Sequence, residues 1–372
     1  MSEKSWSITR RTVLGLAAGA VALGAAVVGP FAGSARAEEA FKVGFVYVGP
    51  IGDHGWSYQH DQGRLAVEKQ FGDKVKTTYV ENVAEGADAE RVVTQLAQSG
   101  HKLIFTTSFG FMNPTAKVAK RFPDVKFEHA TGYTRADNLA TYAARFYEGR
   151  YPSGIIAGRM TKSNTIGYIA PFPIPEVVRG INAFVKGLHA VNPDAKVKII
   201  YVNAWYDPGK EREAAETLVA QGADVLVQHT DSAAAMQLAE EKGLTAFGQA
   251  SNMAQFGPTA QATAIVDDWS GYYVQRVQAA MDGTWTSGDV WGGLNTGMVA
   301  MADYGPKVPA EVRAEADALI AQIKSGEFQI FAGPMKDNQG VERIKAGEVA
   351  TDEQLLSMDW YMEGIDAQLP KK

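Results

Sequence analysis

The 372-residue chain contains no cysteine, which excludes disulfide bonds, thiolate metal sites, cysteine nucleophiles and a lipid-modified N-terminal cysteine. It also lacks an excess of positive charge, because 36 lysines and arginines stand against 42 aspartates and glutamates, a formal charge of −6. Nucleic acids and anionic lipids select for clustered basic side chains, so a general polyanion-binding function is excluded. Beyond residue 37, no uninterrupted apolar run reaches the roughly 18 residues that a membrane-spanning helix needs.

Short signatures of common enzymes are missing as well. The sequence has no G-x-S-x-G, no G-x-x-x-x-G-K-[ST], no H-E-x-x-H and no G-x-G-x-x-G after a predicted strand. What is present is an ordinary globular composition, 46% hydrophobic and 21% charged, in a chain longer than one hydrophobic core usually organises. The length favours two lobes, and the missing signatures are moderate evidence against an enzyme, since many hydrolases lack such motifs.

The first 37 residues have the three parts of an export signal. Arg10 and Arg11 precede the apolar stretch 13–28, and Ala35-Arg36-Ala37 offers a cleavage site before Glu38. The paired arginines resemble a twin-arginine signal, and the alternative is an uncleaved membrane anchor. We expect cleavage and a periplasmic mature protein with 32 basic against 41 acidic side chains, a formal charge of −9.

The mature chain alternates strand-like and helix-like segments, which predicts an α/β fold with parallel sheets covered by helices on both faces. The predicted strands are 43–48, 75–80, 103–107, 125–131, 166–170, 197–202, 225–229 and 245–251, followed later by 264–266. The predicted helices are 88–98, 175–189, 208–221, 233–242, 269–281 and 312–323. Asp207 is the expected N-cap of the third of these helices.

Residues 139–160 interrupt this alternation, because they contain three glycines and a proline. Two four-strand blocks on either side of this break predict two similar lobes. We expect lobe 1 at 38–160 with part of 263–285, lobe 2 at 161–262 with part of 286–335, and a C-terminal segment of undetermined structure at 336–372.

Ligands of open parallel sheets bind beyond the carboxyl ends of the strands, so the residues that follow the predicted strands are the candidates for a binding site. Aromatic faces there suit a flat ring, and carboxylates and amides suit its hydrogen-bonding edge. The predicted ligand-binding residues are Asp53, His54, Trp56, Ser108, Phe109, Trp205, Asp231, Asn252 and Asp267. Asp231 has a second interpretation, as the cap of the helix that follows it. Trp269 and Trp291 are expected in core or hinge packing.

One cluster has the residue types of a metal site. Asp53, His54, His60 and Asp61 could supply zinc ligands, but a structural zinc site needs three or four convergent ones. The first two residues fall in a glycine-flanked loop and the other two in the helix after it. We therefore expect no metal and no cofactor.

The order of several short segments, from about Phe41 to Gly333, resembles the basic membrane protein family, or purine nucleoside receptor type, of ABC transporter substrate-binding proteins. The segments are 43–46 leading to Gly52-Asp53-His54-Gly55-Trp56, then 122–127, 180–184, 207–210, 222–225 and 297–299. The resemblance implies two Rossmann-like lobes with the architecture of type I periplasmic binding proteins. It also implies a purine ligand held between the lobes, an ABC permease as partner, and a monomer.

The resemblance also implies roles for single residues. In nucleoside-binding relatives two aromatic side chains sandwich the purine, and Trp56 and Trp205 fall at their positions. Those relatives hold the ribose with a lysine and an acid. In this chain the segment where the lysine is expected, 264–268, contains none, and Asn252 stands where the acid is expected. Asp231 replaces part of a glycine-rich turn.

These departures predict a free purine base similar to adenine, with Asp231 accepting a hydrogen bond from it. Four alternatives stay open. They are a purine nucleoside, a sugar on the same fold, a periplasmic enzyme that uses Asp53, His54 and Asp231 as acid and base groups, and a ligand-sensing partner of a membrane receptor.

Overall fold

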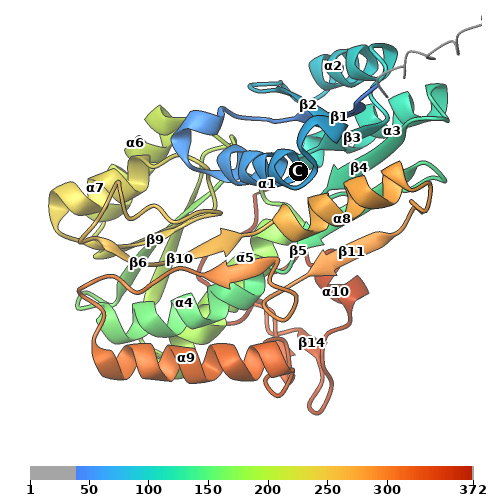
Figure 1. The fold of residues 1–372 in the computed structure, drawn as a ribbon. Coiled ribbons are helices and arrows are strands. Elements are labelled where there is room, and N and C mark those ends of the chain that lie inside the picture. Colours follow the sequence, from blue (N-terminus) through green and yellow to red (C-terminus); the bar gives the residue numbers. More distant parts are fainter. Residues whose placement is uncertain (1–38, 371–372) are drawn as a thin grey trace, which may run out of the picture. The chain divides into compact units, whose positions relative to one another are not determined.

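The computed structural model describes residues 39–370, so the predicted export signal lies outside the described residues, and the side chain of Asp53 is not described either. Two six-stranded sheets with flanking helices organise this part of the chain (Figure 1). The predicted α/β class with parallel sheets is therefore confirmed. No helix within residues 39–370 is long and apolar enough to cross a membrane.

The first sheet has the strand order β11-β5-β4-β3-β1-β2, and all its neighbouring strands are parallel. Its strands are β1 (Phe41–Val46), β2 (Val75–Val80), β3 (Leu103–Thr106), β4 (Lys126–Ala130), β5 (Leu139–Ala144) and β11 (Asp289–Gly292). Val43 and Phe45 of β1 belong to one hydrophobic cluster with α1 and α8, whereas Val46 belongs to another with α2 and α3. Helices therefore cover both faces, which explains why β1 and β3 are mostly apolar.

The second sheet has the order β12-β10-β9-β8-β6-β7, and only β12 is antiparallel to its neighbour. Its strands are β6 (Thr165–Ala170), β7 (Lys196–Tyr201), β8 (Val225–Gln228), β9 (Thr245–Gly248), β10 (Gln261–Asp267) and β12 (Val299–Met301). Helices α6 and α7 share one hydrophobic cluster with this sheet, and α4 and α5 pack on its other face.

The α-helices of residues 39–370 are α1 (Trp56–Phe71), α2 (Ala87–Gln98), α3 (Met112–Arg121), α4 (Tyr147–Met160), α5 (Pro175–Val191), α6 (Pro208–Ala220), α7 (Ala234–Lys242), α8 (Ser270–Met281), α9 (Ala310–Ser325) and α10 (Asp352–Leu356). The predicted helices correspond to α2 and to α5 through α9, and these begin and end close to the predicted positions. The predicted N-cap of α6 is confirmed, because the Asp207 side chain accepts a hydrogen bond from Lys210 N at 3.1 Å.

The C-terminal segment is ordered structure that packs on the second sheet's helices. It contains a small hairpin of β13 (Met335–Lys336) and β14 (Glu342–Ile344), followed by α10. Arg179 of α5 donates to Leu355 O at 2.6 Å, and Asn182 Nδ2 donates to Trp360 O at 2.8 Å. These bonds fix the last described residues to α5.

The expected break at 139–160 was wrong, because these residues form strand β5 and helix α4. Although α4 precedes the expected lobe boundary at residue 160, it packs against α5 and α9, which follow it (Figure 1). The glycines of α4 allow this close packing. A Cβ on Gly154 would lie 2.1 Å from Phe184 O, and one on Gly187 of α5 would lie 2.1 Å from Tyr151 O.

This contact yields a prediction on stability. Gly154→Ala forces α4 and α5 apart, and we expect a loss of about 2–3 kcal/mol in the free energy of unfolding, measured by urea denaturation. Gly271→Ala is the matched control, because Gly271 lies in α8 and its Cβ would meet no atom within 4 Å. That variant should gain about 0.5–1 kcal/mol from helix propensity. Wild-type stability of Gly154→Ala would contradict the close approach.

Candidate ligand-binding site

A pocket lined by aromatic and acidic side chains lies at the carboxyl ends of the strands of both sheets. Its lining residues are Val48, Trp56, Ser108, Phe109, Thr131, Phe146, Glu176, Trp205, His229, Asp231 and Gln249. Nearly all of them follow a parallel strand within a few residues. The pocket therefore lies where the sequence predicts it, beyond the carboxyl ends of the strands.

Trp56 begins helix α1 and is held from three sides. Its indole Nε1 donates to Thr107 O at 2.6 Å, which joins the helix to the loop after β3. Its ring meets Phe146 and Trp269 edge-on, with centroids 5.8 and 5.5 Å away. The Trp56 side chain is thus preorganised as one wall of the pocket.

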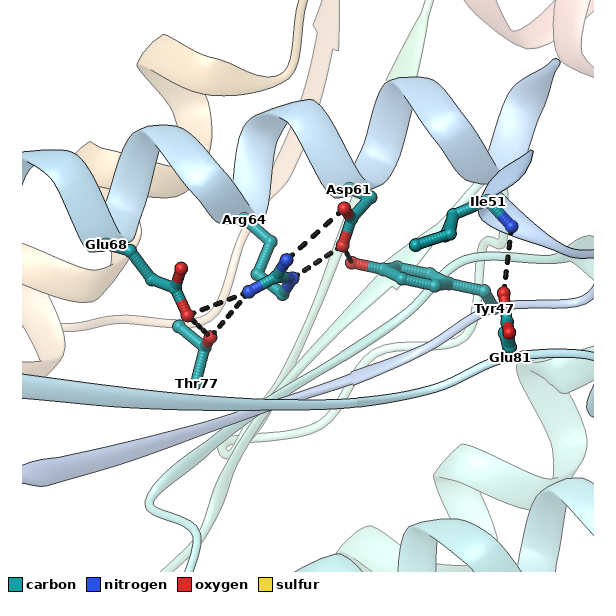
Figure 2. Close-up of polar contacts among 7 residues, drawn as sticks. All are labelled: Tyr47, Ile51, Asp61, Arg64, Glu68, Thr77 and Glu81. Carbon is teal, nitrogen blue, oxygen red and sulfur yellow. Dashed lines mark hydrogen bonds and ion pairs between the residues drawn. The ribbon is translucent and has the colours of Figure 1, made fainter. Parts of the chain in front are cut away.

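Polar contacts fix helix α1 itself to the first sheet (Figure 2). Asp61 accepts from Tyr47 Oη of the β1 end at 3.2 Å and from Arg64 Nε at 2.5 Å. Ahead of the helix, Ile51 N donates to Glu81 at 2.9 Å. These contacts position the loop and the helix that carry Trp56.

Trp205 follows β7 and forms part of the wall contributed by the second sheet. Its Nε1 donates to Glu85 Oε1 at 3.2 Å, and its ring meets Phe172 edge-on at 5.4 Å. Its carbonyl oxygen accepts from Asp231 N at 3.0 Å, so Trp205 and Asp231 are positioned together. The N-cap of α7 is Ala233, without a side-chain bond, and Asp231 therefore does not serve as that cap.

The polar lining is acidic. Asp231 and Glu176 contribute carboxylates, and no lysine or arginine is among the described residues that line this pocket. His229 Nε2 lies 3.4 Å from Glu176 Oε1, and burial lowers the pKa of the His229 imidazole despite the partly compensating effect of Glu176. A pocket with two carboxylates and a neutral imidazole suits a ligand that carries N–H donors, and it disfavours an anion.

Five of the nine predicted ligand-binding residues line this pocket: Trp56, Ser108, Phe109, Trp205 and Asp231. His54, Asn252 and Asp267 do not, and the side chain of Asp53 is not described. Trp269 is fully buried in the core, as expected.

The structure gives the three outlying residues other surroundings. The His54 ring packs on Tyr58, with centroids 4.3 Å apart. Asn252 Oδ1 accepts from Ala254 N at 3.0 Å and from Gln261 Nε2 at 2.8 Å, which stabilises its own loop. Asp267 is fully buried at the end of β10, and burial raises the pKa of its carboxyl well above the usual value. The prediction that these three contact the ligand is not supported by the pocket.

Six lining residues escaped prediction: Val48, Thr131, Phe146, Glu176, His229 and Gln249. A signal existed for four of them, because they lie at or within two residues of the end of a predicted strand: Val48, Thr131, His229 and Gln249. Phe146 follows β5, which the glycine-rich sequence after it concealed. Glu176 had no signal, since it stands in the first turn of α5 as an ordinary surface carboxylate would.

The cluster considered for zinc is occupied with other contacts. Asp61 pairs with Arg64, and His60 stacks on Trp269 at 4.6 Å and contacts Tyr273 Oη through Nδ1 at 2.5 Å. Across residues 39–370, no group of three histidines or carboxylates could hold a metal ion. Of the three groups in the enzyme alternative, Asp231 lines the pocket, His54 does not, and the side chain of Asp53 is not described.

Loops of the two sheets meet beside the pocket. Ser251 Oγ, after β9, donates to His54 O, before α1. A Cβ on Gly55 would lie 2.1 Å from Asp231 O, so only glycine permits this approach. The two lobes are therefore in contact around the pocket in this structure.

Comparison with known proteins agrees with this geometry. The sequence profile of the family described as ABC transporter substrate-binding protein PnrA-like matches residues 40–332. This chain belongs to that family. It is therefore a substrate-binding protein of an ABC transporter, a class that binds a small molecule and works with a permease. The family resemblance noted from the sequence is confirmed.

Two relatives of this PnrA-like protein are informative about ligands. A purine-binding protein of Brucella abortus is 56% identical over 91% of this chain and 97% of its own length. A putative ABC transporter glucose-binding protein of Haloferax volcanii is 40% identical over 89% of this chain and 82% of its own. Among solved structures, a solute-binding protein of an ABC transporter system from Aeropyrum pernix has a TM-score of 0.67 and 20% identity, covering 80% of this chain and 93% of its own. That likeness supports the fold alone.

Proposed function

We propose that this PnrA-like protein binds a free purine base similar to adenine and delivers it to an ABC permease. The observation that carries the proposal is a pocket with a tryptophan from each sheet, Trp56 and Trp205, and two carboxylates, Asp231 and Glu176. Stacking of a base on an aromatic side chain contributes about 1–3 kcal/mol, and carboxylates accept from the amino and ring N–H groups of the base. The Brucella abortus relative, named as purine-binding, supports the ligand class.

The acidic lining favours adenine over an oxopurine such as hypoxanthine. The amino group of adenine donates hydrogen bonds, whereas an oxo group in the same place would set an oxygen acceptor against a carboxylate. The absence of lysine and arginine from the lining also disfavours a nucleotide, because its phosphate would have no cationic partner. A sugar is the second candidate, because the Haloferax volcanii relative is named as putatively glucose-binding and sugars also stack on tryptophan.

The site of action follows from the N-terminal sequence. Residues 1–37 have the paired arginines, apolar stretch and cleavage site of a twin-arginine signal, so we propose export to the periplasm. Hinge closure of the two lobes on the ligand then presents the closed form to the permease.

Asp231→Asn tests the base-recognition step. The amide replaces one carboxylate oxygen with an NH₂ group, and we expect about tenfold weaker adenine binding with less discrimination against hypoxanthine. Quenching of tryptophan fluorescence during titration measures both affinities. Asp194→Asn, at an exposed position between α5 and β7, is the matched control and should bind as wild type does. Unchanged affinity and selectivity in Asp231→Asn would contradict this role.

A further inference from the structure

Glu85 lies outside the pocket lining but contacts two of the segments that form the pocket. It stands in the loop between β2 and α2, where its side chain is exposed. Its Oε1 accepts from Ser108 Oγ at 2.5 Å and from Gly110 N at 3.0 Å. The same oxygen accepts from Trp205 Nε1 at 3.2 Å. One carboxylate therefore joins the loop after β3 of the first sheet to the loop after β7 of the second.

The contacts within the first sheet hold this carboxylate in place before Trp205 is added. The Glu85 side chain and position 110 are closely packed, because a Cβ on Gly110 would lie 2.2 Å from the Glu85 carboxyl carbon. Two hydrogen bonds and this packing fix Oε1 without any group from the second sheet. Of the three hydrogen-bond donors to Oε1 named above, only Trp205 comes from the opposite lobe.

The bond between Trp205 and Glu85 lies where a ligand would leave the pocket. Val48 and Trp205 line the inner pocket, and the same two residues line a neighbouring depression together with Glu85 and Tyr206. Trp205 thus separates the pocket from this outer depression, and the Glu85 carboxylate holds the indole from the outer side. Moving Trp205 away from Val48 requires that the bond to Glu85 break.

We propose that Glu85 is a positioning residue that holds Trp205 against the ligand in the closed form and thereby slows ligand release. The inference rests on the proposed function for its ligand, because Trp205 is taken as a wall of the purine site. Since the bond joins the lobes only when they are closed, its loss raises the dissociation rate constant and leaves the association rate constant unchanged.

A double-mutant cycle tests the proposal by stopped-flow fluorescence with adenine. Glu85→Ala removes the acceptor, and Trp205→Phe removes the donor while keeping an aromatic face. We expect each to raise the dissociation rate constant about fivefold, and the double variant to show no further increase. Glu85→Gln retains a carbonyl oxygen for the same donors and should stay within about twofold of wild type.

The possible results separate the two hypotheses. Independent effects that multiply in the double variant, or a wild-type dissociation rate in Glu85→Ala, would overturn the role of Glu85. Failure of the wild-type protein to bind adenine would instead overturn the proposed ligand. In that case the same cycle is run with adenosine and with glucose. The Glu85–Trp205 contact joins two protein groups, so the coupling between them does not depend on which ligand the protein binds. Asp88→Ala, an exposed change on α2, controls for the loss of a nearby negative charge.

Discussion

Gly55→Ala is expected to weaken adenine binding about 100-fold while leaving the stability of the fold unchanged. The added Cβ would lie 2.1 Å from the carbonyl oxygen of Asp231, which comes from the opposite sheet. The overlap is between a Cβ and a backbone oxygen, so no side-chain rotation relieves it. The backbone of the closed form therefore has to distort, at a cost of about 3 kcal/mol. In an open form the two loops separate, so the lobes themselves keep their packing. Calorimetric titration and thermal unfolding measure the two effects.

Gly52→Ala is the matched control for this prediction. Gly52 lies three residues earlier in the same loop, and a Cβ there would meet no atom within 4 Å. The variant should bind adenine as wild type does. Equal affinities of Gly55→Ala and Gly52→Ala would show that the approach of the two loops is not required for binding.

Trp205→Ala is expected to weaken adenine binding by a similar factor, about 100-fold. The change removes one aromatic wall of the pocket, and the stack of a base on such a wall contributes about 1–3 kcal/mol. It also removes the Nε1 donor of the bond to Glu85. Since Trp205 is only half-buried, its loss should cost the fold little.

Trp205→Phe separates these two contributions. Phenylalanine keeps the flat apolar face, so we expect only about a fivefold loss, the part due to the bond with Glu85. Calorimetry on wild type and both variants gives the comparison. If Trp205→Phe bound as weakly as Trp205→Ala, stacking would not be the main contribution of this side chain.

Most of the regular parts of the fold were predictable, because the strands are runs rich in apolar and β-branched residues and several helices have clear boundary residues. Strand β2 was predicted to the residue, and α6 began where Asp207 caps it. Helix α4 was not predictable in this way, since glycine and proline are poor helix formers in isolation. Its glycines Gly154 and Gly158 allow the close contact with α5, and that partner is defined only by the tertiary structure.

The same division holds for the site. Trp56, Trp205 and Asp231 could be predicted, because the carboxyl ends of parallel strands meet at one edge of a sheet. His54 and Asn252 also follow strands, but their side chains are held by Tyr58 and by Gln261 within or beside their own loops. The position of a residue just after a strand predicts the edge of the sheet at which it lies. It does not predict the direction in which the side chain points.

Glu85 shows the opposite case. It stands in a polar loop between β2 and α2, and its sequence context is that of a solvated carboxylate. Its proposed role depends on contacts among three loops: its own loop, the loop after β3 and the loop after β7 of the second sheet. The bond from Trp205 joins residues 120 positions apart, and no local sequence pattern predicts such a contact.

The measurement that tests the central claim most directly is calorimetric titration of the unfolded and refolded mature protein, which is free of any retained ligand. Adenine, adenosine and glucose are each titrated separately. The account predicts one adenine bound per chain, adenosine bound at least about tenfold more weakly because the ribose has no lysine to hold it, and no heat from glucose. Tight binding of glucose, or a preference for adenosine over adenine, would contradict it.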